Sequence, residues 1–254
     1  MGLLDIEKRE GLALLRLNDP QRRNLLSSGL CRELIAAVKE ANADESVRAI
    51  VICAAGKAFC AGADLDDLKA AAAGDTAAVQ DVYDAFLTVA DSPLPTLALV
   101  QGPAVGAGMN LALACDARIV GSAGSFDTRF LQIGLHPGGG HTWMLLRAVG
   151  WETASRLLLF SRTVKAEEAV RIGLAAEQAP NEELEAAALA LLANLRNTPR
   201  ELLLRTKASL RQAAASSHQE SYKHETAEQM WSLHQPAFEK LVSDLQFKLG
   251  KRGD

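Results

Sequence analysis

Two glycine-bearing loops contain the backbone groups best suited to chemistry in this sequence. They read GKAFCAGADL (56–65) and QGPAVGAGMNLALACD (101–116), and each follows an apolar run of strand length. Small residues let a backbone approach a ligand closely, and N–H groups at a helix start point outward with the positive end of the helix dipole. Two such groups from different loops could converge on one oxygen, as in an oxyanion hole. Glycine turns before helices also serve packing alone, so composition by itself leaves both interpretations open.

Neither loop contains a phosphate-binding motif. No GK[ST] triplet closes either loop, and the second reads GxxxGxG rather than GxGxxG, which excludes a P-loop and a dinucleotide fingerprint. The four cysteines form no CxxC pair, and no histidine lies at zinc-finger spacing from them. We therefore expect reduced, buried thiols and no metal site.

Four segments together closely resemble the enoyl-CoA hydratase/isomerase (crotonase) superfamily. They are AFCAGADL (58–65), GPAVGAGMNLALACDARIV (102–120), IGLHPGGG (133–140) and QRRNLL (21–26). Their order, spacing and flanking elements agree with the family over essentially the whole chain. The resemblance implies an α/β fold of the crotonase-like (ClpP/crotonase) type, a spiral of ββα turns with a helical C-terminal trimerisation region.

The resemblance also implies a substrate and an oxyanion hole. The substrate is an acyl-CoA thioester, so coenzyme A enters as part of the substrate and no separate cofactor is expected. The first donor follows the glycine of the AGAD loop and corresponds to Ala63; the second is the middle residue of the GAG turn, Ala107. Their backbone N–H groups would bind the thioester oxygen as it gains enolate charge.

Both glutamates that hydratases of this family use are replaced in this chain. The first position, three residues beyond the second oxyanion donor, is Asn110. The second, four residues before Gly134 of the LG-like motif, is Phe130. An amide cannot take a proton from water near neutral pH, and a phenyl ring can neither bind nor deprotonate it. Hydration by a pair of glutamates is therefore in doubt.

Three side chains are candidates for the missing proton carrier. Asp127 precedes Phe130 by three residues, and His136 and His141 flank the glycine turn that follows. A histidine titrates near working pH and could transfer protons. Each has an ordinary structural alternative, because Asp127 could cap a short helix through residues 128–129 and either histidine could be a hydrogen-bonded structural group.

The resemblance assigns further residues to substrate binding. Arg23 and Lys57 lie on loops that border the nucleotide and pantetheine in the family, where phosphates favour cations. Ala61, Asp64 and Leu65 surround the first oxyanion donor. The two cations could equally be solvated surface side chains, and Asp64 could equally anchor its loop through backbone N–H groups.

The elements that position these residues alternate between strands and helices in the first half of the chain. Strands are expected at 3–8, 12–17, 48–53, 96–100 and 117–120, with a helix over 26–41, alanine-rich helices to about 90 and another helix to 115. Buried strands separated by helices predict an α/β core. After about residue 138, helices are expected at 140–149, 151–160, 165–172, 181–196 and 199–216.

A final helical region begins near residue 218, and Pro236 should divide it. Beyond that proline an apolar stripe is formed by Phe238, Leu241, Val242, Leu245 and Leu249. A stripe this apolar must pack on its own core or on another subunit. We expect an α/β core with the acyl-CoA site over 1–198 and a helical region over 199–254 that assembles a homotrimer or a dimer of trimers.

Composition restricts the class of protein. The 254 residues are 48% hydrophobic and 23% charged, with a net charge of −4, which argues against a nucleic-acid partner. The uncharged stretch 92–115 is long enough for a membrane span, but its prolines and glycines favour a buried strand, turn and helix. The first residues have no secretory apolar core, so a cytoplasmic location is expected.

Three functions remain open on this evidence. The first is an acyl-CoA lyase or isomerase, as in fatty acid metabolism, that acts through a stabilised enolate. The second is a non-catalytic acyl-CoA binding protein on the same scaffold, and the third is an acyl-CoA thioesterase. The oxyanion hole favours the first and third, whereas Asn110 and Phe130 favour the second.

Overall fold

A six-stranded sheet is the centre of residues 1–196 in this computed structural model, which describes residues 2–250 of the chain. The strand order is β1-β2-β3-β4-β6-β9, and β1–β2 is antiparallel whereas the other neighbours are parallel. The strands are β1 (Leu4–Arg9), β2 (Leu12–Leu17), β3 (Ala49–Ala54), β4 (Thr96–Val100), β6 (Ala117–Gly121) and β9 (Glu177–Ala179). Strands β3 and β4 are buried along their whole length, which explains their uninterrupted apolar sequences.

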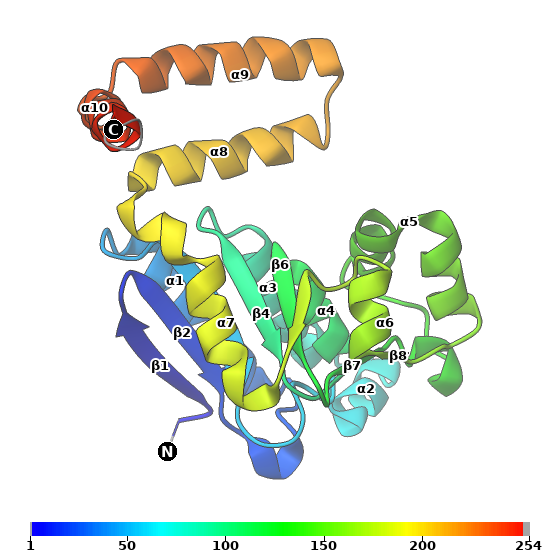
Figure 1. The fold of residues 1–254 in the computed structure, drawn as a ribbon. Helices are drawn as coiled ribbons and strands as arrows, with labels where there is room; N and C mark the ends of the chain where they lie inside the picture. The colour runs from blue at the N-terminus through cyan, green and yellow to red at the C-terminus, as the bar shows by residue number, and fades with distance from the viewer. Residues whose placement is uncertain (1, 251–254) are drawn as a thin grey trace. The chain divides into compact units, whose positions relative to one another are not determined.

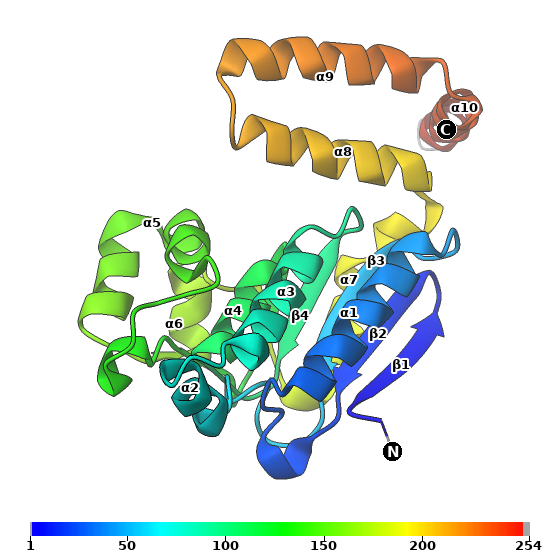
Figure 2. The same cartoon turned by 180° about the vertical axis from the view of Figure 1, so that it is seen from behind.

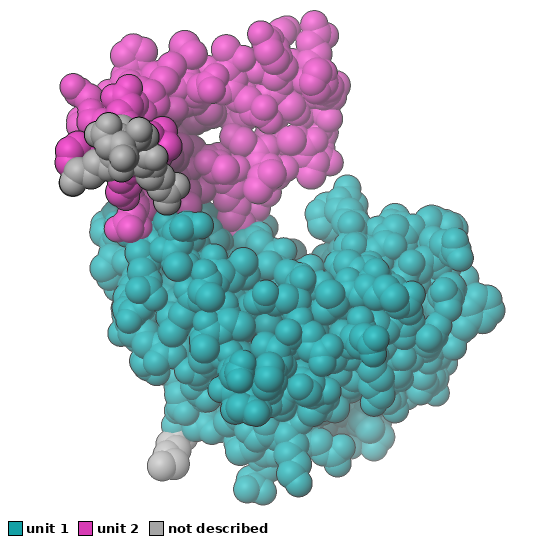
Figure 3. Space-filling model, in the orientation of Figure 1, with its two compact units in different colours: residues 1–196 teal, residues 197–254 magenta. Residues whose placement is uncertain are grey.

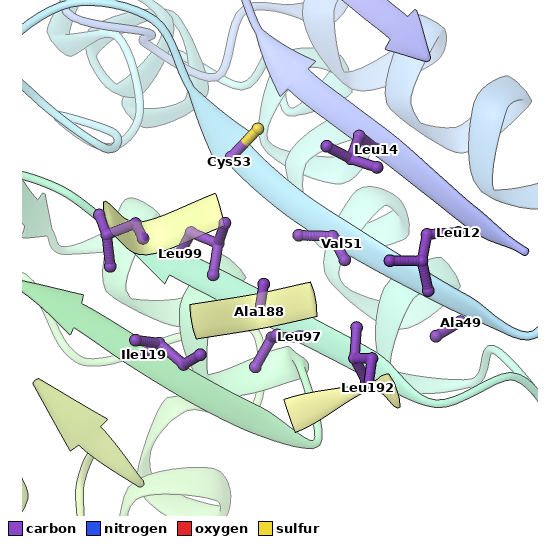
Figure 4. Packing of buried hydrophobic residues seen from close by; sticks show 11 residues of the cluster. Leu12, Leu14, Ala49, Val51, Cys53, Leu97, Leu99, Ile119, Ala188 and Leu192 are labelled. Carbon is purple, nitrogen blue, oxygen red and sulfur yellow. The ribbon is translucent and has the colours of Figure 1, made fainter. Parts of the chain in front are cut away.

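Helices cover both faces of this sheet. Helices α1 (Ser28–Ala43) and α3 (Ala77–Ala90) pack against each other on one face (Figure 2), and α7 (Leu184–Leu191) covers the other (Figure 1). Alternate strand residues contact α7, because successive side chains of a strand point to opposite faces. Figure 4 shows this cluster, in which Leu97 and Leu99 of β4 lie near Ala188 and Leu192.

A second, three-stranded sheet was not expected from the sequence. Its order is β5 (Pro103–Val105), β7 (Ser125–Asp127) and β8 (Val164–Lys165). These strands have two or three residues each, too short to show a period-two pattern. Strand β5 is followed directly by α4 (Ala107–Ala114), so the predicted glycine turn is a short strand joined to a helix through Gly106.

The remaining helices of this unit follow the predicted order with two differences. The regions expected at 140–149 and 151–160 form α5 (His141–Leu159), which is interrupted by non-helical backbone at Gly150. Helix α2 (Leu65–Ala72) and α6 (Ala166–Arg171) lie within predicted helical regions. The expected helix 181–196 is instead a 3₁₀ turn, α7 and a second 3₁₀ segment, Ala193–Asn197.

Residues 197–254 form a second compact unit (Figure 3). It contains α8 (Arg200–Ala213), α9 (His218–Leu233) and α10 (Pro236–Gly250). Ser217 begins α9 with a capping box that includes Glu220. The predicted division at Pro236 is confirmed, because α10 starts at that residue. The division between the units falls after Arg196.

Candidate functional site

The first glycine loop is fixed between two neighbouring segments. Cys60 donates its N–H to the carbonyl of Pro103 at 3.2 Å, and Val105 donates to the carbonyl of Cys60 at 3.0 Å. On the other side Leu26 donates to the carbonyl of Gly62 at 2.9 Å. The second loop contains both the unexpected strand β5 and the start of α4. Strand β5 therefore connects the first loop to the start of that helix.

Glycines allow the two loops to approach this closely. Gly62 has a φ of +100°, and a Cβ at that position would lie 2.7 Å from the Val105 carbonyl oxygen and 3.5 Å from the Ala107 nitrogen. A Cβ at Gly108 would lie 2.2 Å from the carbonyl oxygen of Cys60. Side chains at either position would force the loops apart, so both glycines serve a close backbone contact.

Ala63 and Ala107 line one cavity of about 840 Å³. Ala107 is the first residue of α4, so its N–H has no acceptor within that helix. Among the described residues, no backbone carbonyl accepts from the N–H of Ala63. The structure therefore places both residues at the same cleft, and the convergence of their N–H groups on one oxygen stays a prediction.

The cleft walls are largely apolar and come from three segments. Helix α2, helix α3 and the segment 129–138 face the two glycine loops. The apolar residues that these three segments contribute to the lining are Leu65, Leu68, Ala71, Ala72, Val79, Val82, Phe86, Phe130, Ile133 and Leu135. An apolar cleft with few polar groups is typical of a small-molecule site.

The two substituted glutamate positions both border this cleft. Asn110 is almost fully buried and lies on α4, one turn beyond Ala107. Its Nδ2 donates to the carbonyl of Gly138 at 2.9 Å. Phe130, the other position, presents a mostly buried ring to the same cavity. No ionisable group therefore stands at either position.

His141 lies behind this wall and not in it. The side chain is 1% exposed, and it is not among the residues that line the cavity. Its Nδ1 is hydrogen-bonded to Oδ1 of Asn110, and its ring lies edge-on to that of Phe130. Burial lowers the pKa of His141 to about 4. Its Nε2 is buried and has no hydrogen-bond partner among residues 2–250. The single proton of the neutral ring is therefore assigned to Nδ1, which faces the Asn110 oxygen.

The other two proposed proton carriers differ in their surroundings. Asp127 is buried and accepts from the backbone N–H of Arg129 at 2.9 Å, from its guanidinium at 2.5 Å and from the Thr163 hydroxyl at 3.2 Å. Asp127 thus stabilises the turn that follows it, although it does not cap the 3₁₀ helix Phe130–Ile133, and it does not line the cleft. His136 does line the cleft, is exposed, and contacts the Pro137 carbonyl through Nδ1 at 2.7 Å.

Most of the residues expected to bind the substrate line the cleft, and one does not. Arg23, Ala61, Asp64 and Leu65 line the cleft, whereas Lys57 is exposed and does not. Asp64 caps α2 by accepting from the N–H of Asp66 at 3.0 Å, and it pairs with Arg22 at 2.5 Å. Asp64 is the one carboxylate among the described residues that line this cavity. Arginine side chains therefore outnumber carboxylates among the lining residues of the cleft.

Sequence reasoning missed Tyr83, which lines the cleft from α3. A Cβ at Gly138 would lie 2.2 Å from the Tyr83 hydroxyl, so this hydroxyl lies directly against the glycine turn. The signal that could have found it is the helical spacing of Val79, Val82, Tyr83 and Phe86. Cys60, in the first glycine loop, is fully buried as expected of the cysteines, and burial raises the pKa of its thiol to about 12.

Residues 2–250 contain neither a metal-binding cluster nor a helix suited to crossing a membrane. No group of three or more His, Cys, Asp or Glu side chains there has an arrangement suited to a metal ion. Within the same residues, no helix has both the length and the apolarity needed to cross a membrane.

Comparisons of sequence agree with the geometry of these loops. A family model described as enoyl-CoA hydratase/isomerase matches residues 7–243. A Mycobacterium tuberculosis protein named probable enoyl-CoA hydratase is 47% identical over 230 residues, covering 90% of this chain and 88% of its own length. Another so named, from Rhodobacter capsulatus, is 41% identical over 180 residues, which is 70% of this chain and 69% of its own.

Solved structures extend the similarity to the whole fold. An enoyl-CoA hydratase from Polaromonas superposes with a TM-score of 0.91 at 25% identity, covering 97% of this chain and 98% of its own. An enoyl-CoA hydratase from Mycobacterium smegmatis gives a TM-score of 0.90 at 27% identity, covering 98% and 97%. The predicted crotonase-like α/β fold is therefore confirmed.

Proposed function

Because this chain belongs to the enoyl-CoA hydratase/isomerase family, we propose that its cleft binds an acyl-CoA thioester and stabilises the enolate of that thioester. The observation that supports the proposal most is the shared cavity of Ala63 and Ala107, on two loops that are hydrogen-bonded together. Both N–H groups are available for a ligand oxygen. The activity proposed is that of a lyase or isomerase in acyl-CoA metabolism, such as fatty acid metabolism in the cytoplasm.

The thioester oxygen would accept hydrogen bonds from both N–H groups. When a proton leaves Cα, negative charge develops on this oxygen, and the positive end of the α4 dipole lies beside it. The loops are fixed by backbone hydrogen bonds before the ligand arrives, so little reorganisation is needed. Each such donor typically contributes about 3–4 kcal/mol to lowering a barrier.

Cations at the cleft would bind the coenzyme. Arg22 and Arg23 both border the cavity, on the short segment after β2. Arg22 is already paired with Asp64, whereas Arg23 forms no ion pair with another described residue. An exposed guanidinium without an acidic partner is suited to a phosphate oxygen. Lys57 does not line the cavity. It would contact a phosphate only if the nucleotide of coenzyme A extends beyond the cavity.

Proton transfer is where this site departs from a two-glutamate hydratase. Asn110 and Phe130 supply no base, and Asp64 already accepts hydrogen bonds from a helix start and an arginine. His136 is the titratable imidazole that borders the cleft, with the Tyr83 hydroxyl as a second polar group. We propose enolate-forming chemistry with His136 as the proton carrier, and slow hydration of simple enoyl-CoA.

Infrared spectroscopy of a bound thioester tests the oxyanion hole. Butyryl-CoA labelled with ¹³C at the thioester carbonyl should show its C=O stretch at lower frequency when bound, because two N–H donors polarise the bond. Ala107→Pro removes one donor at a helix position that accepts proline, and it should abolish most of the shift.

Ser28→Pro is the matched control, because Ser28 is likewise the first residue of its helix, α1. This variant should retain the full shift. Binding without any change in the C=O frequency of the wild-type complex would contradict the proposed hole.

A further inference from the structure

The amide of Asn110 is oriented by two protein contacts. Its Oδ1 is hydrogen-bonded to Nδ1 of His141, and its Nδ2 donates to the carbonyl of Gly138 at 2.9 Å. A carbonyl can only accept, so the atom facing Gly138 must be the nitrogen. The imidazole proton then lies on Nδ1 and is donated to the amide oxygen. Rotation of the amide by 180° would set its oxygen against the Gly138 carbonyl, where two acceptors would face each other.

The other hydrogen of this amide has no acceptor among the described residues. The NH₂ group has two hydrogens, and Gly138 accepts one of them. Asn110 also lines the cavity, although it is almost fully buried. The oxygen of the amide is occupied by His141. Toward the cleft this residue therefore offers a hydrogen-bond donor, whereas a carboxylate in its place would offer only acceptors.

The position of this donor along α4 relates it to a particular ligand atom. Asn110 follows Ala107 by three residues, so both lie on the same face of the helix, about 4.5 Å apart along its axis. If the thioester oxygen is bound at Ala107, the second carbon beyond the carbonyl, C3 of the acyl chain, lies within reach of Asn110. Phe130 lines the same cavity, where its ring would pack against the hydrocarbon of a bound acyl chain.

We propose that Asn110 selects acyl-CoA ligands with an oxygen atom on C3, and that His141 is the residue that positions its amide. The C3 oxygen accepts the free Nδ2–H, so the favoured class is 3-hydroxyacyl-CoA over the saturated acyl-CoA of equal length. This inference rests on the proposed binding of acyl-CoA thioesters. It adds a specificity to that function and requires no proton transfer.

Calorimetry with three ligands tests the preference. The ligands are butyryl-CoA and the two enantiomers of 3-hydroxybutyryl-CoA, which differ from butyryl-CoA by one hydroxyl. One enantiomer should bind roughly three- to tenfold more tightly than butyryl-CoA, the gain expected from one added hydrogen bond. Equal or weaker binding of both enantiomers overturns the inference and leaves the proposed function intact. Failure of all three to bind overturns both.

Variants separate a specific contact from general damage. Asn110→Leu should bring the ratio of the two dissociation constants close to one. His141→Leu should do the same, whereas His141→Gln retains an N–H donor and should restore the preference. His218→Leu, the same change at an exposed histidine of α9, should leave the ratio unchanged. A preference that survives Asn110→Leu in a folded variant would also overturn the inference.

Discussion

The place of Asn110 beside the oxyanion loop was predictable from the sequence, but the side chains that it contacts were not. The spacing within the glycine motif fixed Asn110 one turn beyond Ala107, and the structure places it there. Its contact with His141 joins residues 31 positions apart. Such a contact depends on how α4 and α5 pack, which has no signature in the local sequence. For the same reason Tyr83, in an alanine-rich helix, was not expected at the cleft.

The buried histidine should make stability depend on pH. Burial lowers the pKa of His141 from 6.5 to about 4, because desolvation disfavours the charged ring. Its neutral form therefore supports the folded state fully above about pH 6.5, and that support is lost as the pH falls to about 4. Between pH 7 and 4.5 the wild type should lose about 2 kcal/mol of unfolding free energy more than His141→Gln.

Urea unfolding of both proteins at the two pH values measures this difference. Comparison with the variant is needed because carboxyl groups also titrate in this range, and they are common to both proteins. Parallel loss of stability in wild type and variant would show that His141 is not the group responsible.

At the scale of elements, the long strands and helices were predictable and the short ones were not. Strands β3 and β4 have continuous apolar runs, which are typical of strands buried on both faces. Strand β5 has three residues and pairs with β7, which is distant in sequence. Yet β5 aligns the two loops, because its backbone is hydrogen-bonded to Cys60. The resemblance predicted that the two loops come together. The structure was needed to show that backbone hydrogen bonds between β5 and Cys60 hold them there.

Substitution of one glycine should separate these loops. Gly62→Ala would impose a left-handed backbone on alanine and bring its Cβ to 2.7 Å from the Val105 carbonyl. Gly74→Ala is the matched control, because its φ of +104° is similar and no atom lies within 4 Å. The control should lose roughly 1–2 kcal/mol of stability, while Gly62→Ala loses more and also binds acyl-CoA weakly. Thermal unfolding and calorimetry measure the two effects; equal effects of both substitutions would contradict the role of the close contact.

At the scale of the whole molecule, the chain separates into an α/β unit and a helical unit. The change from alternating elements to consecutive helices indicated this organisation. The apolar stripe of α10 is substantially exposed in the single chain: Phe238 is 42% exposed, Leu241 44% and Leu245 55%. A stripe of this kind favours burial against another surface. We propose self-association through the second unit as a homotrimer or a dimer of trimers.

Sedimentation should detect a species of about three times the 27.1 kDa chain mass, or a multiple of it. Replacing Leu241 and Leu245 together by glutamate should shift the protein toward monomer, because charges on the stripe oppose its burial. Ser243→Glu adds charge on the opposite side of α10 and should leave the assembly intact. A wild-type monomer at micromolar concentration would contradict this proposal.

A site that binds an acyl-CoA thioester but lacks the carboxylates that activate water should bind an enoyl-CoA without hydrating it quickly. The most direct test follows crotonyl-CoA by absorbance at the enoyl thioester band while calorimetry measures its binding to the same preparation. General acid and base groups each contribute about 100- to 10,000-fold to rate. With Asn110 and Phe130 at the cleft, we therefore predict clear binding and very slow loss of the enoyl band. Rapid hydration at the rate of a two-glutamate enzyme, or no binding of crotonyl-CoA at all, would contradict the account.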